Sequence, residues 1–470
     1  MSDEKLLIGP RIKRLRTSLG LTQARMAGDL GISASYLNLM ERNQRAVSAK
    51  VLVRLAERYD IDMAGFTGAG DAHLVAELHE ALRDPLFRGD SISKNEAEDI
   101  VGISPSAAKA FLRLYGQHRD RALQTHYGTE VAADGLDLLE QSNAAVAGVR
   151  RFIHTNANHF DALDRAAEEL SQTLGGTKSL LIAALTQRLK DEHDLSVRIV
   201  PVDIMPEMLR YFDRHAKRIN LSELLPQSGR RFQLAHQIGM LEHRDTIDAI
   251  VKSAKLPGSD AERLCRTTLA NYFAAAVLMP YGRFLKEAEN CRYDVELLAH
   301  RFGTSFEQTA HRMTTLGRSD ARGVPFFFVR MDVAGNITKR FSAGRFQLPQ
   351  FGGACPLWNV HAAFQSPGRT LTQMVETPDG AKYITAARRV TRGGGSFAEP
   401  AQSFAVGIGC DIAYAPRVIY AASDSPTPIG PNCYLCERQN CRARAHPPLG
   451  KALSFDERAR GMSLFRFDDG

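Results

Sequence analysis

The sequence predicts a multidomain protein that is mainly α-helical, with α+β parts in its C-terminal two thirds, and three observations predict this. At 470 residues the chain exceeds the ~250–300 residues that one hydrophobic core usually serves. Apolar residues recur at helical spacing in the first third, and helix and strand patterns alternate from about residue 160. After residue 324, strand-like segments are separated by Gly-rich turns, which is typical of a strand-rich domain.

These patterns divide the chain into four segments. We expect a helical N-terminal domain at 1–66, a helical linker or dimerisation region at 67–155, an α+β domain at 156–322 and a strand-rich domain at 323–470. The Gly/Ala-rich stretch at 67–72 has the composition of a linker. The amphipathic helices predicted at 73–155 favour dimerisation and plain packing equally.

The composition is that of an ordinary globular protein, with 44% hydrophobic and 24% charged residues. No run of 18 apolar residues occurs and residues 1–10 lack the apolar centre of a signal peptide, so we expect a cytoplasmic protein without a membrane partner. The seven cysteines mostly gather late in the chain, which favours metal binding over disulfides. A net charge of +7 is only weak evidence for a polyanionic partner.

The N-terminal segment has the pattern of a helix-turn-helix. Thr22 and Ser33 stand where N-caps of the second and third helices belong, and Gly31 supplies the tight turn between them. In this motif the third helix presents its first polar residues to base edges while the second crosses the phosphate backbone. The base-reading candidates are Ser33, Ser35, Tyr36 and Asn38. The phosphate-binding candidates are Gln23, Arg42 and Arg45.

This segment resembles the lambda-repressor-like, XRE-type helix-turn-helix family over its whole length. The resemblance implies binding of double-stranded operator DNA as a dimer on two half-sites. Residues 1–66 show no dimer interface of their own, so we expect a homo-oligomer, a dimer or a dimer of dimers, to form through downstream residues.

The order helix, strand, strand, then a helix that begins RRFQLAH, resembles the domain of ImmA/IrrE-type metallopeptidases. In those enzymes this helix carries His-Glu-x-x-His, which supplies two zinc ligands and a general base. Here the stretch is His236-Gln237-Ile238-Gly239-Met240. Glutamine cannot accept the proton and methionine is a poor zinc ligand, so the motif disfavours a peptidase. A regulatory metallopeptidase remains the alternative, and it predicts zinc at His236.

A later segment, DVELLAHRFGTSFEQTAHRMTTLGR, imitates a second helix-turn-helix through Gly303 and Ser305. It offers few polar residues to DNA and lies inside the peptidase-like run of helices. We therefore do not expect it to contact DNA.

The most specific chemical feature is Cys433-x2-Cys436-x4-Cys441. A Cys-x-x-Cys turn places two thiolates within reach of one metal, and a third follows closely. Zinc and a 4Fe–4S cluster are both compatible with this spacing. The candidates for the fourth ligand are Cys410, Cys355 and His446.

The whole chain is similar to the short-chain fatty acyl-CoA regulator family, through the order of its parts and the segments ACPLWNVHAAF, GIGCD and PIGPNCYLCERQNCRARAHPP. The resemblance implies a transcription factor, not an enzyme, that senses propionyl-CoA first and acetyl-CoA next. It also favours a 4Fe–4S cluster over zinc. The ligands would be Cys410, Cys433, Cys436 and Cys441, with Cys355 as the alternative fourth. Activation and repression stay open, as does a redox-only sensor.

An acyl-CoA effector would fit the peptidase-like domain once its metal is lost. Its phosphates need cationic partners, its adenine a flat cation or aromatic ring, and its acyl group an apolar surface. For the nucleotide end the candidates are Arg198, Arg210, Arg230 and Arg231. For the acyl end they are Tyr211, Tyr272 and Phe273.

Overall fold

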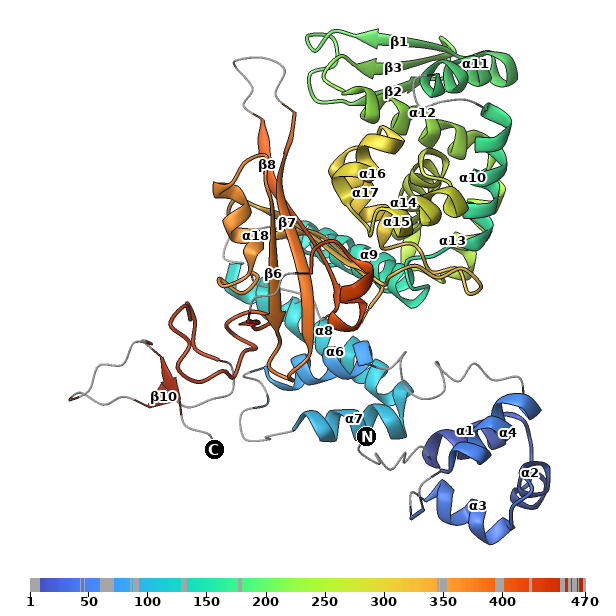
Figure 1. The fold of residues 1–470 in the computed structure, drawn as a ribbon, viewed down its shortest axis with the longest axis vertical. Coiled ribbons are helices and arrows are strands. Elements are labelled where there is room, and N and C mark those ends of the chain that lie inside the picture. Colours follow the sequence, from blue (N-terminus) through green and yellow to red (C-terminus); the bar gives the residue numbers. More distant parts are fainter. Residues whose placement is uncertain are drawn as a thin grey trace. The chain divides into compact units, whose positions relative to one another are not determined.

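The computed structural model describes residues 9–42, 44–45, 47–59, 72–84, 87, 93–127, 133–175, 180–344, 346, 353–393, 401–421, 425–448, 453–454, 458, 463 and 465–467. The chain forms two compact units, one of residues 1–131 with 449–452 and one of residues 132–448 with 453–470. The predicted fold class is confirmed: helices dominate, and the second unit adds a small sheet and a larger one (Figure 1).

The N-terminal domain is built from four helices around one small core. They are α1 (Gly9–Ser18), α2 (Gln23–Leu30), α3 (Ala34–Glu41) and α4 (Ala49–Tyr59). Thr22 and Ser33 cap α2 and α3 as predicted, because each side chain accepts a hydrogen bond from the backbone N–H three residues on. Gly31 adopts the left-handed conformation with φ 65°, and a Cβ there would also meet the Arg54 guanidinium at 2.3 Å. The turn therefore requires glycine.

Three further helices of the first unit lie in the part of the chain that the structure describes. They are α6 (Ala72–Leu82), α7 (Lys94–Ile103) and α8 (Pro105–Tyr127). Leu78, Ala97 and Val101 lie in their shared core. Ser93 and Glu96 form a capping box at the start of α7. Most of the predicted linker at 67–72 lies outside the described residues.

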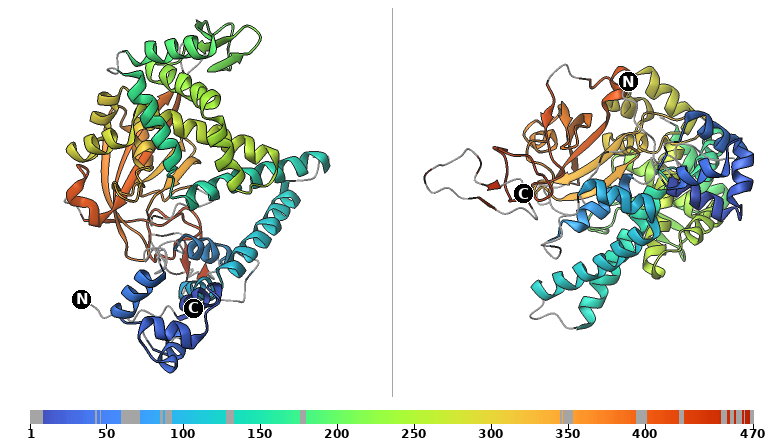
Figure 2. Two further views of the ribbon diagram at one scale, coloured as in Figure 1. Left: turned by 90° about the vertical axis from the view of Figure 1, so that its right-hand side faces the viewer. Right: turned by 90° about the horizontal axis from the view of Figure 1, so that it is seen from below.

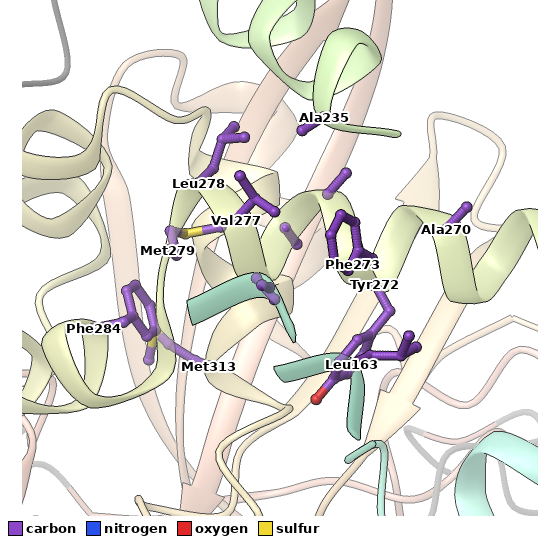
Figure 3. Packing of buried hydrophobic residues seen from close by; sticks show 14 of the residues in the cluster. Leu163, Ala235, Ala270, Tyr272, Phe273, Val277, Leu278, Met279, Phe284 and Met313 are labelled. Carbon is purple, nitrogen blue, oxygen red and sulfur yellow. The ribbon is translucent and has the colours of Figure 1, made fainter. Parts of the chain in front are cut away.

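The second unit begins with a bundle of helices. Its helices are α9 (Ala133–Thr155), α10 (Asp161–Leu174), α11 (Leu181–His193), α12 (Gln227–Glu242), α13 (Arg244–Ser253), α14 (Gly258–Leu278), α15 (Tyr281–Asn290), α16 (Val295–Phe302) and α17 (Phe306–Met313). The long α14 is its centre, and α9, α10 and α12 all pack against it. Figure 3 shows Tyr272 of α14 beside Leu163 of α10, and both side chains are buried. Because α9 packs on α14, it belongs to the second unit although we grouped it with the linker helices.

A small sheet lies beside this bundle. It has the order β1-β3-β2, from β1 (Ser196–Val200), β3 (Arg218–Ser222) and β2 (Arg210–Asp213). β1 runs parallel to β3 and β2 runs antiparallel to it. Paired residues share a face. One face therefore carries the row Ile199, Leu221 and Arg210, and Leu221 is part of the core.

The larger sheet has six strands in the order β5-β4-β8-β7-β6-β9. These are β4 (Phe327–Asp332), β5 (Ile337–Ser342), β6 (Thr370–Glu376), β7 (Lys382–Arg392), β8 (Gln402–Asp411) and β9 (Thr427–Pro428). Phe328, Ile384 and Ile408 on one face join the core of the helical bundle, so the orange strands lie against the green and yellow helices in Figure 2. The other face has its own core, to which α18 (Asn359–Ala362) contributes Val360. A short pair, β10 (Leu453–Ser454) and β11 (Arg466–Phe467), stands apart from both sheets.

The helices α16 and α17 repeat the local geometry of α2 and α3. Both pairs join two eight-residue helices through a left-handed glycine, Gly31 or Gly303, and a capping serine two residues later. The equivalent of the recognition helix is nevertheless inside the bundle, because Glu307, Thr309 and Arg312 of α17 are buried. These polar side chains are therefore not available at the surface of the second unit.

Candidate functional sites

The predicted DNA contacts gather on and around α3. Ser33, Ser35, Arg42 and Arg45 are exposed, and Tyr36 is partly exposed on the same helix. The Arg45 guanidinium lies 4.9 Å from the centre of the Tyr36 ring. This cation–π contact holds a charge beside an aromatic group at the candidate DNA-reading surface.

Gln23, the first residue of α2, lies beside Asn38 of α3. Gln23 Nε2 donates a 2.8 Å hydrogen bond to Glu41 Oε2 and lies 3.5 Å from Asn38 Oδ1. Arg16 of α1 donates two bonds to the same Glu41 carboxylate, at 2.6 and 3.1 Å. Burial alone would raise the pKa of Glu41, but the hydrogen bonds from Arg16 and Gln23 and the Arg16 charge lower it. Sequence analysis missed Arg16 and Glu41 because the pair forms across 25 residues.

In the peptidase-like domain, His236 and Met240 are one turn apart on α12, so they share a face of the helix. His236 is buried and its Nδ1 lies 3.0 Å from Asn271 Oδ1 of α14. Burial and the nearby positive charge of Arg210 lower the pKa of His236 to about 4, against the opposing effect of the Asn271 hydrogen bond. The imidazole is therefore neutral near pH 7.

Arg210 reaches the same place from β2, where its side chain is partly buried. Its Nη1 makes only a long contact of 3.4 Å with the Gln233 carbonyl of α12. Within the described part of the chain, no carboxylate lies at ion-pair distance from its guanidinium. Burial lowers the pKa of Arg210 to about 10, so it still carries its charge at neutral pH.

The structure does not bring the other effector candidates together with Arg210. Arg198 and Tyr211 pair with Asn220 on the opposite face of the small sheet, where Tyr211 is exposed. Arg231 instead donates to the Gly303 carbonyl at the end of α16, and Arg230 donates to the Glu223 carbonyl.

The two aromatic candidates on α14 are enclosed by protein. The Tyr272 hydroxyl donates a 2.6 Å hydrogen bond to Asp164, which also accepts one from Arg312. Phe273 packs so closely against α12 that a Cβ at Gly239 would lie 2.7 Å from its ring. Both side chains therefore contribute to the core. From the sequence we expect them instead to contact the acyl group of the effector.

The candidate metal ligands are divided by the larger sheet. Cys410 of β8 is buried in the core shared with the helical bundle, whereas Cys355 is buried in the core on the opposite face. Burial raises the pKa of Cys410 to about 12, which keeps it a thiol. Side chains two residues apart on a strand point to the same face, so Cys410 of β8 points to the same side as Ile408. This is why it is separated from Cys355.

Cys355 lies close to the Cys-x2-Cys turn. Burial raises the pKa of Cys355, and hydrogen bonds from the backbone of Gly430 and Leu357 oppose this rise. The nearby Cys436 and Cys433 add to it. Gly430 packs closely against Cys436, since a Cβ there would lie 2.7 Å from Cys436 Sγ.

Arg444 organises the loop that carries the three clustered cysteines. It donates to the carbonyls of Cys433 and Cys436 at 2.9 and 2.8 Å and to the Arg438 carbonyl at 2.9 Å. Cys441 is partly exposed, and the candidate His446 stacks on Tyr434. Among the described residues, no three His, Cys, Asp or Glu side chains are arranged closely enough to hold a metal ion. A set of thiols fits the ligand preference of zinc and of iron–sulfur clusters.

No helix in the described ranges is both long and apolar enough to span a membrane.

Comparisons with known proteins match the three parts of this architecture. Residues 12–66 match the helix-turn-helix family, residues 190–314 the IrrE N-terminal-like domain, and residues 315–465 the family described as short-chain fatty acyl coenzyme A regulator, C-terminal. A solved structure of a Mycobacterium tuberculosis transcriptional regulator superposes with a TM-score of 0.64 at 38% identity. The superposition covers 67% of this chain and 98% of the chain in the solved structure.

Curated relatives match over nearly the full length. A protein of Cereibacter sphaeroides named propionyl-CoA carboxylase regulator is 40% identical over 99% of this chain and 100% of its own. The HTH-type transcriptional regulator RamB of Mycobacterium tuberculosis is 36% identical, over 98% of each chain. The HTH-type transcriptional regulator PrpR of the same species is 35% identical over 97% of this chain and 94% of its own. The chain therefore belongs to the short-chain fatty acyl-CoA regulators, a family of helix-turn-helix transcriptional regulators.

Proposed function

We propose that this regulator binds operator DNA as a homodimer and changes its DNA affinity when a short-chain acyl-CoA binds. Propionyl-CoA is the preferred effector, because the full-length relative with 40% identity is named for propionyl-CoA carboxylase. The effector acts by binding the DNA-competent and incompetent states with different affinities. The observation that carries the effector proposal is the charged Arg210 beside His236, where metallopeptidases hold zinc.

The same place argues against peptidase activity in this chain. Met240 replaces the second histidine and Gln237 replaces the catalytic glutamate. A guanidinium close enough to lower the pKa of His236 also repels a second cation. The domain is therefore a binding domain in our proposal, and the protein acts in the cytoplasm, where its DNA is.

We further propose that Cys355, Cys433, Cys436 and Cys441 hold a 4Fe–4S cluster, with zinc as the alternative occupant. The choice of Cys355 over Cys410 is supported by the sheet, which separates Cys410 from the Cys-x2-Cys turn. Such a cluster supplies one-electron redox chemistry as well as a structural link between the loop and the sheet. Arg444 would hold the loop carbonyls in place around it.

Calorimetry tests the effector proposal. Acetyl-, propionyl- and butyryl-CoA, with free CoA as a control, are titrated into protein purified without oxygen. We expect propionyl-CoA to bind most tightly and free CoA weakly. The operator affinity, measured with and without propionyl-CoA, must then change. Folded, cluster-loaded protein that binds none of the three esters contradicts the proposal, and zinc-dependent peptide cleavage lost in His236→Ala favours the peptidase instead.

A further inference from the structure

Within the described residues, Arg210 is a partly buried charge without a carboxylate partner. Its strand places it in one row with Leu221, on the core-facing side of the small sheet. The polar groups that face it are neutral: the Gln233 carbonyl at 3.4 Å and the imidazole of His236. Removing a cation from water is unfavourable unless an anion or good hydrogen bonds replace the water. The Arg210 guanidinium therefore lacks a negative partner among these residues.

Three other arginines of this unit with little exposure have a negative partner that Arg210 lacks within the described part of the chain. Arg312 is fully buried but bonds Asp164 at 2.6 Å. Arg231 is buried and donates to the Gly303 carbonyl, at the C-terminal end of α16, where the helix dipole is negative. Arg188 pairs with Glu242 on α12 at 2.7 Å. Each of these guanidinium groups has a negative partner, and Arg210 differs from all three.

The surroundings of Arg210 accept an anion and reject a cation. His236 is neutral at pH 7, since burial and Arg210 lower its pKa to about 4, so it does not compete for negative charge. Asn271 occupies His236 Nδ1 and fixes the ring. An anion beside Arg210 would supply a counter-charge and offset the cost of burying the Arg210 guanidinium.

We propose that Arg210 binds a phosphate group of the acyl-CoA effector on the face of α12 that carries His236. This inference rests on the proposed function. The phosphates are the ionised groups that every acyl-CoA carries near neutral pH, and a guanidinium binds phosphate through two parallel hydrogen bonds. The cation site of the metallopeptidases has, in this chain, become an anion site.

Two substitutions that remove the same charge test the site. Arg210→Met keeps the side-chain length without the charge, and Arg214→Met makes the same change at an exposed position in the turn that follows β2. We expect Arg210→Met to weaken propionyl-CoA binding by roughly 30-fold or more in calorimetry, as loss of an enclosed charged partner usually does. Arg214→Met should change it less than about twofold. Arg210→Lys, which keeps a charge without the fork, should fall between wild type and Arg210→Met.

Two further measurements distinguish an unfolded variant from a wrong inference about Arg210, and a wrong inference from a wrong proposed function. The apo Arg210→Met protein should melt no lower than wild type, because it loses a charge that no carboxylate compensates, which shows that the variant is folded. Inorganic phosphate should raise the melting temperature of wild type and Arg214→Met, but not of Arg210→Met, at matched ionic strength. Equal propionyl-CoA affinities of folded Arg210→Met and wild type overturn the inference. If phosphate stabilises through Arg210 while no acyl-CoA binds wild type, the proposed function fails and the anion site stands.

Discussion

Asp164 of α10 and Arg312 of α17 form an ion pair of 2.6 Å in which neither side chain has any solvent exposure. Tyr272 of α14 donates to the same carboxylate, so three helices meet at one charge. Burial alone would raise the pKa of Asp164, but the Arg312 charge and hydrogen bonds from His159, Tyr272 and Arg312 lower it below the ordinary value. The network ties the helices that surround α14 into one unit.

Replacing Asp164 by asparagine should destabilise the second unit by about 3–5 kcal/mol at pH 7, because Arg312 then becomes an uncompensated buried charge. A carboxyl with a lowered pKa contributes stability above its unfolded pKa of ~3.9 and loses it as the pH falls through the folded value. The difference between wild type and variant should therefore shrink below about pH 4. Urea denaturation at pH 7 and at lower pH measures both effects.

Asp194→Asn is the control for this change, because Asp194 is exposed and pairs with Lys190 and Lys217 at the surface. Its cost should stay within about 0.5 kcal/mol. Similar costs for both variants would contradict the role assigned to the buried network.

Gly239→Ala should destabilise the protein by about 1–3 kcal/mol, since the new Cβ would lie 2.7 Å from Phe273 Cδ1 in a filled core. Gly282→Ala, at the start of α15, meets only an ordinary 3.4 Å contact with Glu168 and should be nearly neutral. Thermal denaturation of both proteins compares the two sites. A neutral Gly239→Ala would mean that α12 and α14 can separate at no cost, against the close packing of these two helices.

Arg42→Ala and Arg45→Ala should weaken binding to all DNA sequences alike, because each removes the exposed positive charge of a predicted phosphate contact. The slope of log K against log salt should become shallower by about 0.9 for each phosphate that is no longer neutralised. Asn38→Ala should instead change the preference among operator variants by about 1–3 kcal/mol at one base pair. Fluorescence anisotropy at several salt concentrations, on operator and random duplexes, distinguishes these outcomes. An unchanged salt slope for both arginine variants would remove them from the phosphate contacts.

Replacing Cys355, Cys433, Cys436 or Cys441 by serine should abolish the visible absorption and the iron content of anaerobically purified protein. Cys410→Ser should keep both, because Cys410 lies on the other face of the sheet and its buried thiol has a pKa of about 12. Iron and zinc are counted by elemental analysis. Loss of metal in folded Cys410→Ser, with retention in Cys355→Ser, would reverse this assignment.

Local sequence patterns predicted the helix-turn-helix in detail. Thr22, Ser33 and Gly31 do what their chemistry requires, because caps and turns depend on residues only a few positions apart. The loss of the peptidase motif was equally visible, since His236 and Met240 stand one helical turn apart. The Ser93–Glu96 capping box is another such local feature.

Sequence patterns predicted less about the effector site. Arg198, Arg210 and Tyr211 lie near one another along the chain, but strand pairing puts Arg210 on one face and the other two on the opposite face. Asn271, the partner of His236, lies 35 residues away and carries no motif. Among the described residues, Arg210 has no carboxylate at ion-pair distance, and no local sequence pattern predicts this.

By itself, the sequence determined the local elements of this protein: two helix-turn-helix units with the same glycine turn and the same serine cap, and a run of cysteines in one loop. Only the tertiary structure showed how α17 is enclosed, because its buried Arg312 pairs with Asp164, 148 residues away. It likewise decided that Cys355, and not Cys410, shares a side of the sheet with the cysteine loop. Whether a helix is buried, and which face of a sheet a residue lies on, depend on contacts between distant segments. Local sequence patterns do not encode these contacts.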